Sequence, residues 1–428
     1  MEKDQRTEGL NRRLLELGDY EISDAILEEI TEIKLELNFE ADRDKLFLKQ
    51  MAKVNWLRLG DRNTTFFYKS ATYRRRKNMI KGLENEDGIL ITDEEEVSNL
   101  ATEYFNDLFS SKQVSNCERL FDSFSPCIKE EHNVMLMKYF KEEEVVKAIK
   151  SIAPLKALGQ DGFPAIFYQK YWHIIGKEVT GFCLDVLNGR RNVGEINNTN
   201  IVLIPKEKSA KSMNKFRPIS LCNVLDGCIE ETQRAFVPGR QITDNIFVAY
   251  EVLHSFKKRR SNSKKSFTLK LDMSKAYDRI EWSFLEKMMR NIGFCEDWIS
   301  IIMKCITSVV YTVGINGKNG EQFRPQRGLR QGDPFPYLFL ICVEGFSRLI
   351  ELAKREGRLS RTNVGRGNVS ISHLFFADDS ILFGEASIDG ANNLKRVIKD
   401  YEEDLGQLVN FDKLLIYFSG NVDLATQD

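Results

Sequence analysis

The sequence predicts an α+β fold: an antiparallel sheet with helices on one face, preceded by a helical N-terminal extension. Residues 267–271 alternate apolar and polar side chains, as a strand with one buried face does. Apolar runs on both sides of Asp378 and Asp379 predict two strands folded back at an acidic turn. Near the N-terminus, apolar residues recur at the spacing of one helix face, at Ile22, Ile26, Ile30, Ile33 and Leu37.

The N-terminal extension is expected to contain several distinct segments. A helix is predicted over 10–55, and a basic segment follows over 56–82. Residues 86–89, Glu-Asp-Gly-Ile, form a turn signal between two short strands. Residues 94–150 are expected to be mainly helical, apart from a polar, serine-rich loop over 110–126.

Asp272 ends the strand predicted over 267–271, and a helix is expected after it. Gly293 marks the predicted end of that helix, because glycine commonly terminates helices. One face of the helix is apolar and is formed by Trp282, Leu285, Met288, Met289 and Ile292. This segment therefore places an acidic side chain beside a well-packed helix.

The three aspartates Asp272, Asp378 and Asp379 are the candidate chemical centre. Burying a carboxylate is costly unless a cation or a hydrogen bond compensates it, and neighbouring carboxylates also repel each other. Hard carboxylate oxygens are the ligands that Mg²⁺ prefers, and two-metal phosphoryl transfer uses such a site. Two alternatives stay open: an ordinary hairpin turn at Asp378 and Asp379, and Asp272 as the cap of the following helix.

Length and composition bound the class of protein. The 428 residues are enough for two or three structural units, and 42% apolar content is that of a globular protein. No apolar run reaches the length of a membrane span and no signal segment is visible, so we expect an intracellular protein without a membrane partner. The cysteines are scattered without a CxxC pair, which argues against zinc.

Charge is unevenly distributed although the net charge is only −1. Residues 43–81 hold 12 Lys and Arg against two acidic residues, and six aromatic residues lie among them. Phosphate contacts combined with base stacking suit such a stretch to RNA. Its densest part is the basic tetrad Arg74, Arg75, Arg76 and Lys77. The alternative is a solvated helix face with buried aromatic rings.

Five motifs follow one another in one order along the chain. They are Phe-Arg-Pro-Ile-Ser-Leu at 216–221, Ala-Phe-Val-Pro-Gly-Arg at 235–240, the strand ending in Asp272, Leu-Arg-Gln-Gly-Asp-Pro at 329–334, and Phe-Ala-Asp-Asp at 376–379. In this order they resemble the reverse transcriptases of the LINE-type (non-LTR) retrotransposons of plants. The resemblance covers most of the chain.

The resemblance implies a right-hand polymerase fold with an antiparallel palm sheet. We expect an N-terminal extension over 1–150, shortened fingers over 151–250 and a palm over 251–428. The implied function is RNA-directed DNA polymerisation, a two-metal nucleotidyl transfer to a primer 3′-hydroxyl. Its partners would be an RNA template, a DNA primer and dNTPs. A nuclear location follows from the resemblance only, and no protein partner can be inferred.

The resemblance also implies a role for each matching residue. Asp272, Asp378 and Asp379 would be catalytic and would hold two Mg²⁺ ions, with Mn²⁺ as a substitute. Tyr277 stands at the aromatic steric gate that excludes a 2′-hydroxyl. The other residues implied to meet the nucleotide are Gln331, Gly332, Arg217, Lys206 and Lys413, and the last of these matches a lysine that protonates pyrophosphate.

Simpler structural roles exist for three of these residues. The alternative for Tyr277 is a core aromatic residue, for Arg217 a loop ion pair, and for Lys413 a solvated strand residue.

The chain departs from the family pattern at several places. The connection from Asp333 to Pro336 is one residue short, which would rotate a following helix by about 100° unless the loop absorbs it. The segment after Val224 is shorter than in the family, which predicts a costly cavity. No thumb follows before Asp428 and no endonuclease precedes residue 1. These departures predict a fragmentary, degenerate enzyme. The alternative is an inactive retroelement remnant that retains at most RNA binding.

Overall fold

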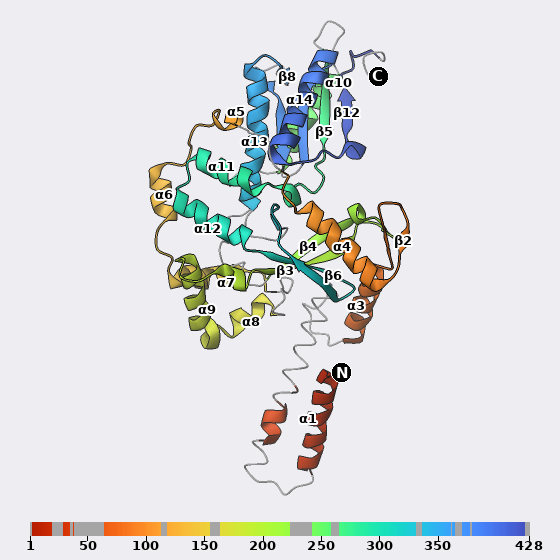
Figure 1. The fold of residues 1–428 in the computed structure, drawn as a ribbon, viewed down its shortest axis with the longest axis vertical. Helices are drawn as coiled ribbons and strands as arrows, with labels where there is room; N and C mark the ends of the chain where they lie inside the picture. Colours follow the sequence, from red (N-terminus) through yellow and green to blue (C-terminus); the bar gives the residue numbers. More distant parts are fainter. Residues whose placement is uncertain are drawn as a thin grey trace. The chain divides into compact units, whose positions relative to one another are not determined.

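The computed structural model of the protein divides into two compact units, 1–81 and 82–428 (Figure 1). The residues that it describes are 2–18, 29–34, 37, 64–112, 118–154, 163–222, 242–257, 265–330, 336–360, 362–363, 370–376 and 379–423.

The N-terminal unit is helical where it is described, with α1 (Glu2–Gly18), a helical stretch over 29–34, and α3 (Thr64–Asn78). The Arg13 guanidinium donates to the Glu29 carboxylate at 2.8 Å. A continuous helix would separate residues 16 apart in sequence by about 24 Å. Residues 2–18 and 29–34 therefore do not belong to one continuous helix, and the prediction of one helix over 10–55 is wrong.

The apolar stripe of that predicted helix is only partly described. Ile33 is buried, whereas Ile22 and Ile26 lie outside the described residues.

The second unit begins with the hairpin predicted around residues 86–89. Strands β1 (Leu83–Glu84) and β2 (Leu90–Ile91) pair antiparallel, and Gly88 supplies the positive φ of 75° that the turn requires. The predicted helical region follows. Its helices are α4 (Glu94–Leu108), α5 (Glu118–Phe121), α6 (Glu130–Leu136) and α7 (Glu142–Ser151). Helix α5 lies inside 110–126, so the prediction of a loop over that whole range is wrong.

Four antiparallel strands form what we call the aspartate sheet, in the order β10-β11-β5-β12. Their bounds are His373–Phe376, Asp379–Glu385, Ser266–Leu271 and Leu415–Phe418. The predicted strand over 267–271 and the predicted acidic hairpin are both confirmed, because Phe376 pairs with Asp379 across the turn. A further two-stranded pair, β8 (Thr362–Asn363) with β9 (Ser370–Ile371), is separate from this sheet.

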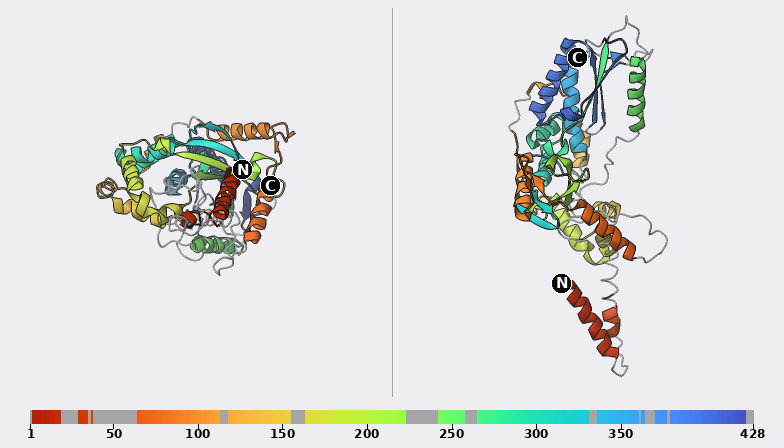
Figure 2. Two further views of the ribbon diagram at one scale, coloured as in Figure 1. Left: turned by 90° about the horizontal axis from the view of Figure 1, so that it is seen from below. Right: turned by 90° about the vertical axis from the view of Figure 1, so that its right-hand side faces the viewer.

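Helices cover both faces of the aspartate sheet, which corrects the prediction of helices on one face (Figure 2). Helices α11 (Trp282–Ile292), α13 (Pro336–Arg355) and α14 (Ile388–Leu405) contribute to the large hydrophobic core on one face. Helix α10 (Ile242–Lys257) packs Val252 and Phe256 against Phe383 on the other. Thr268 pairs with Phe383 across the strands and is only 6% exposed, so a polar residue on this face is buried.

The end of α11 and the start of α13 bear on two of the predictions. Helix α11 ends at Gly293 in the left-handed conformation, as predicted. Helix α13 begins at Pro336 and presents one continuous buried face, which includes Phe339, Cys342 and Phe346. The shortened connection before Pro336 and the shortened segment after Val224 both fall outside the described residues.

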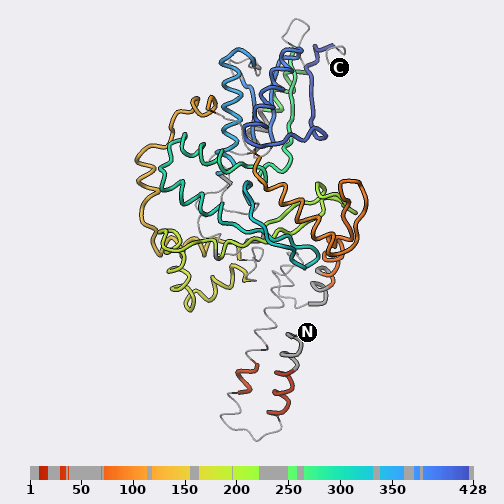
Figure 3. The backbone as a smooth tube through the Cα atoms, viewed as in Figure 1, coloured from red at the N-terminus to blue at the C-terminus, as the bar shows by residue number. Residues whose placement is uncertain are grey.

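A second sheet, in the order β4-β3-β6-β7, was not predicted. Its strands β3 and β4 are antiparallel, β3 and β6 are parallel, and β6 and β7 are antiparallel. Their bounds are Asn198–Pro205 for β3, Phe216–Cys222 for β4, Val310–Ile315 for β6 and Lys318–Phe323 for β7. Helix α4 packs against β6 and β7, which lie more than 200 residues later in the chain (Figure 3).

The remaining helices complete the second unit. They are α8 (Ala165–Lys170), α9 (Trp172–Leu187) and α12 (Glu296–Thr307). Helices α7, α8 and α9 share a small core of their own around Val145, Ile149 and Cys183. Within the described part of the chain, no helix combines the length and apolarity that crossing a membrane requires.

Candidate functional site

Two of the three predicted aspartates lie opposite each other on neighbouring strands. Asp272 directly follows β5, and Asp379 is the first residue of β11. The antiparallel register pairs Leu271 with Ser380, so the next pair along the ladder is Asp272 and Asp379. Asp378 lies outside the described residues. Asp272 and Asp379 therefore lie on neighbouring strands of one sheet, as two carboxylates that share a metal ion must.

Asp272 is held by the segment before β12. Its Oδ2 accepts from Lys413 Nζ at 2.8 Å and from Asn410 Nδ2 at 3.4 Å. The Asn410 amide also donates to the Asp272 carbonyl at 2.9 Å. Glu281, not Asp272, occupies the N-cap of the following helix α11, so the helix-cap alternative is wrong. Lys413 lies in a short 3₁₀ turn, Phe411–Lys413, rather than in a strand.

Asp379 has a lysine partner that sequence reasoning missed. Lys270 Nζ lies 3.2 Å from Asp379 Oδ1. Lys270 is the exposed residue of β5, two positions before Asp272. Lys270 could have been predicted to lie near the site, because residues two positions apart lie on the same face of a strand.

Lys206 directly follows β3 of the second sheet, and Arg217 lies on β4. Lys206 donates to the Asn214 carbonyl at 2.8 Å. Partial burial lowers the pKa of Lys206, and the positive charges of Lys413 and Arg217 lower it further, while Asp272 acts in the opposite direction. Arg217 is exposed on β4, paired with Ile204 across the strands, and so it is not a loop residue.

Tyr277 lies in the 3₁₀ turn Tyr277–Arg279 after Asp272. Its ring stacks on Phe339 of α13, with centroids 4.1 Å apart and planes 12° from parallel. The ring is half-buried, so Tyr277 contributes to the core and also has an accessible side. The Leu329 amide donates to the Tyr277 carbonyl at 2.8 Å. Gln331 and Gly332 follow immediately but lie outside the described residues.

Two charged residues, Lys275 and Asp278, flank Tyr277 in the sequence and were not predicted as part of the site. Lys275 has a positive φ of 55°, and its Nζ lies over the rings of Tyr104 at 4.7 Å and Phe105 at 5.1 Å. Burial lowers the pKa of Lys275 to about 8 and raises the pKa of Asp278 to about 6. Among the described residues, Lys275 Nζ and Asp278 Oδ2 have no hydrogen-bond partner. Isolated charges of this kind carry no sequence pattern.

The donor set at Asp272 and Asp379 fits a hard divalent cation. Both carboxylates offer oxygen ligands, and each already has a lysine ammonium as counter-charge. In the described ranges, no three His, Cys, Asp or Glu side chains gather as a ligand set. The third predicted ligand, Asp378, is outside those ranges.

The basic tetrad forms the last turns of α3 in the N-terminal unit. Arg75, Arg76 and Lys77 are exposed, and Arg74 is partly exposed. Tyr73 beside them is 68% exposed, so this aromatic ring is not buried beneath a solvated face.

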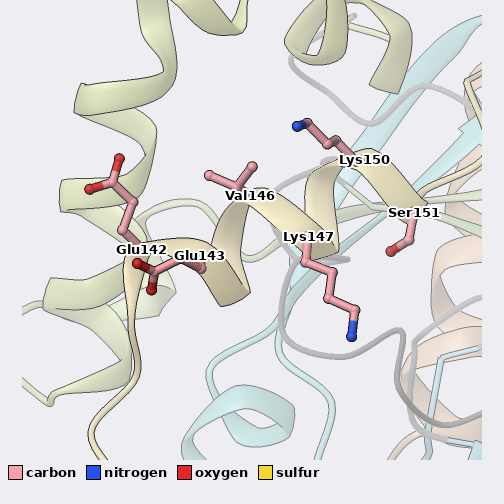
Figure 4. A pocket seen from close by; sticks show the side chains of 6 residues that line it. All are labelled: Glu142, Glu143, Val146, Lys147, Lys150 and Ser151. Carbon is pink, nitrogen blue, oxygen red and sulfur yellow. The ribbon is translucent and has the colours of Figure 1, made fainter.

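A pocket on α7 contains none of the predicted site residues (Figure 4). It is lined by residues of that one helix, with carboxylates at its N-terminal end and lysines nearer its C-terminal end: Glu142, Glu143, Val146, Lys147, Lys150 and Ser151.

Residues 204–422 match the family model described as reverse transcriptase (RNA-dependent DNA polymerase). The chain is 26% identical over 348 residues to the transposon TX1 uncharacterized 149 kDa protein of Xenopus laevis, which covers 77% of this chain and 26% of that protein. It is 28% identical over 228 residues to the retrovirus-related Pol polyprotein from the type-2 retrotransposable element R2DM of Drosophila melanogaster, covering 50% of this chain and 20% of that protein.

A shorter match has higher identity. An uncharacterized mitochondrial protein of Arabidopsis thaliana is 48% identical over 67 residues, covering 15% of this chain and 55% of that protein. The chain thus spans about a quarter or less of the TX1 and R2DM proteins.

Proposed function

The chain belongs to the reverse transcriptase family, and from this premise we propose that it is the polymerase part of a LINE-type, non-LTR retrotransposon of plants. Its reaction is the RNA-directed addition of dNTPs to a DNA primer. The names of the transposon and R2 relatives support the element class, and the Arabidopsis match supports the plant source. Fingers are assigned to 151–250 and the palm to 251–428.

The observation that carries this proposal is the pairing of Asp272 with Asp379 at the open end of two neighbouring strands. Together with Asp378, these carboxylates would hold Mg²⁺. When bound, Mg²⁺ supplies charge neutralisation of the triphosphate and lowers the pKa of the primer 3′-hydroxyl.

The chain's own cations surround this centre. Lys206 and Arg217 bind the triphosphate. Their positive charges stabilise the negative charge that develops on the phosphates during the reaction. Lys413, held 2.8 Å from Asp272, donates a proton to the leaving pyrophosphate.

Base and sugar selection are assigned to three other residues. Tyr277 presents its accessible side to the sugar and excludes a 2′-hydroxyl. Gln331 and Gly332 line the base-pair pocket, where a glycine allows close approach of the backbone.

The test is incorporation of a single labelled dNTP onto a primer annealed to RNA, using Asp272→Asn and Asp379→Asn. Each variant is expected to lose about two to three orders of magnitude in rate. Glu385→Gln is the matched control, because Glu385 is an exposed carboxylate at the far end of β11, about 20 Å along the strand from Asp379. Equal rates in the Asp272→Asn variant, the Glu385→Gln variant and the unmutated chain would refute the proposed site.

A second candidate function, RNA binding without catalysis, rests on the exposed basic tetrad of α3. Replacing Arg74, Arg75, Arg76 and Lys77 by glutamine should reduce the slope of log affinity against log salt by about 3 for single-stranded RNA. Asp379→Asn is the control and should leave the slope unchanged. An unaltered slope in the glutamine variant would exclude the tetrad as the RNA contact.

A further inference from the structure

Glu281 and Arg327 form an ion pair that is almost completely buried. Arg327 Nη1 lies 3.1 Å from Glu281 Oε1, and both side chains are 1% exposed. Their backbones also form an isolated antiparallel bridge. A buried ion pair is costly to desolvate unless its remaining polar atoms are hydrogen-bonded. The other hydrogen-bond partners of Glu281 and Arg327 therefore identify the segments that this ion pair connects.

Those partners come from the end of α4 and the residues after it. Arg327 Nε donates to the Leu108 carbonyl at 2.9 Å. Ser111 Oγ donates to Glu281 Oε2 at 2.7 Å, and the Lys112 amide donates to Glu281 Oε1 at 3.2 Å. The amide of Arg327 also donates to the Phe109 carbonyl at 3.2 Å. Residues 108–112 thus complete a network whose other members lie inside the matched range 204–422.

The same network joins the Tyr277 turn to the segment that enters Gln331. The Gly328 amide donates to the Ile280 carbonyl at 2.7 Å, and the Leu329 amide donates to the Tyr277 carbonyl at 2.8 Å. Trp282 Nε1 donates to the Gly328 carbonyl at 2.8 Å. Gly328 has a positive φ of 96°, and a Cβ there would lie 2.8 Å from the Asp278 carbonyl. The two segments are therefore in direct backbone contact.

The far end of this segment is tied to the second sheet. Arg330 is buried, and its Nη1 donates to Asn197 Oδ1 at 2.5 Å and to Thr199 Oγ1 at 3.0 Å. Leu329 and Arg330 are thus fixed on both sides just before Gln331.

We propose that Glu281, Arg327 and Ser111 are positioning residues that hold the Tyr277 turn against the segment entering Gln331, and so set the width of the pocket for the nucleotide sugar. None of the three contacts the nucleotide; they act through Tyr277. The inference rests on the proposed polymerase function, and it makes residues 108–112, which lie outside the matched range, part of sugar selection.

Ser111→Ala is the first test, because it removes one hydrogen bond to Glu281 from an exposed residue and leaves the hydrophobic core intact. Ser110→Ala is the matched control: the Ser110 hydroxyl donates only locally, to the Asn106 carbonyl at 2.6 Å. Hydrogen exchange of the Gly328 and Leu329 amides should become about three- to tenfold faster in Ser111→Ala than in Ser110→Ala. Equal exchange rates would overturn the proposed linkage, whether or not the chain polymerises DNA.

The second test measures nucleotide selection in primer extension. Ser111→Ala should raise the KM for dNTP and reduce the preference for dNTP over rNTP by about three- to tenfold each, with kcat nearly unchanged. Ser111→Thr keeps the hydroxyl and should restore both values. A purely structural role would lower the amount of folded enzyme, and hence the apparent kcat, without moving the sugar preference. An unchanged preference in an active Ser111→Ala enzyme overturns the inference, whereas no extension by the unmutated chain instead overturns the proposed function.

Discussion

At the residue scale, each described aspartate of the site has its own lysine. Lys413 meets Asp272, and Lys270 meets Asp379. The sequence predicted Asp272, Asp379 and Lys413, because motif residues mark them. It missed Lys270, although Lys270 lies on the same strand face as Asp272. It could not predict Lys275 or Asp278, because a single charge in a turn has no periodicity from which its burial could be inferred.

Replacing Lys413 tests its proposed role as proton donor. Lys413→Met should lower the rate of nucleotide incorporation by about two orders of magnitude, because the leaving pyrophosphate loses its acid. Lys265→Met is the control, since Lys265 is also an exposed lysine paired with an aspartate, Asp423, and has no assigned role. Single-turnover incorporation measures both. Equal incorporation rates in the two variants would show that Lys413 only balances the charge of Asp272 and does not donate the proton.

His373 makes stability depend on pH. Its ring nitrogens lie 3.0 Å from the hydroxyls of Ser347 and Ser372. Burial lowers the pKa of His373 from its ordinary 6.5 to about 4. Between these values the unfolded chain binds a proton at His373 that the folded protein does not, so the contribution of His373 to the free energy of unfolding falls as pH drops from 6.5 to 4. Asp278, whose pKa is raised to about 6, contributes in the opposite direction.

The size of this effect is about 3 kcal/mol at most. His373→Gln should flatten the dependence in that window, as measured by urea unfolding at several pH values. His254→Gln, at an exposed histidine, is the control and should keep it. An unchanged slope in His373→Gln would exclude His373 as its source.

At the element scale, the sequence predicted elements that are determined by neighbouring residues, but it did not predict the pairing of strands distant in sequence. The hairpin around 86–89, the acidic hairpin of β10 and β11, and the end of α11 at Gly293 each depend on neighbouring residues, and all were predicted. The second sheet pairs β3 with β6, about 110 residues apart, and no local pattern fixes such a partner. One usable signal was missed: Asn316 and Gly317, both with positive φ, form the tight turn between β6 and β7.

Gly293 ends helix α11, and its replacement measures how much the free energy of unfolding depends on a glycine at this position. Its φ is 106°, and a Cβ there would lie 2.8 Å from the Ile128 carbonyl. Gly293→Ala should lower the free energy of unfolding by about 2–4 kcal/mol, from backbone strain together with the steric clash. Gly317→Ala is the control, because its φ is 89° but the space around it is open, so about 1 kcal/mol is expected. Equal losses in urea unfolding would show that the contact with Ile128 is unimportant.

At the scale of the whole molecule, the proposed site is assembled from segments distant in sequence. It would combine the ends of β5 and β11, the turn before β12, Lys206 after β3 and Arg217 of β4. Helix α4 and residues 108–112 join this unit although they precede residue 204. The covering of the aspartate sheet by α10 on its second face could not be predicted, because the polar residues of β5 suggested a solvated face.

We propose that Asp272, Asp378 and Asp379 catalyse template-directed DNA synthesis. The decisive experiment is the extension of a DNA primer along an RNA template of defined sequence with dNTPs and Mg²⁺. The folded chain is compared with its Asp378→Asn, Asp379→Asn double variant. The proposal predicts products that copy the template in the unmutated chain and none in the double variant. No extension by either folded protein, or equal extension by both, would contradict it.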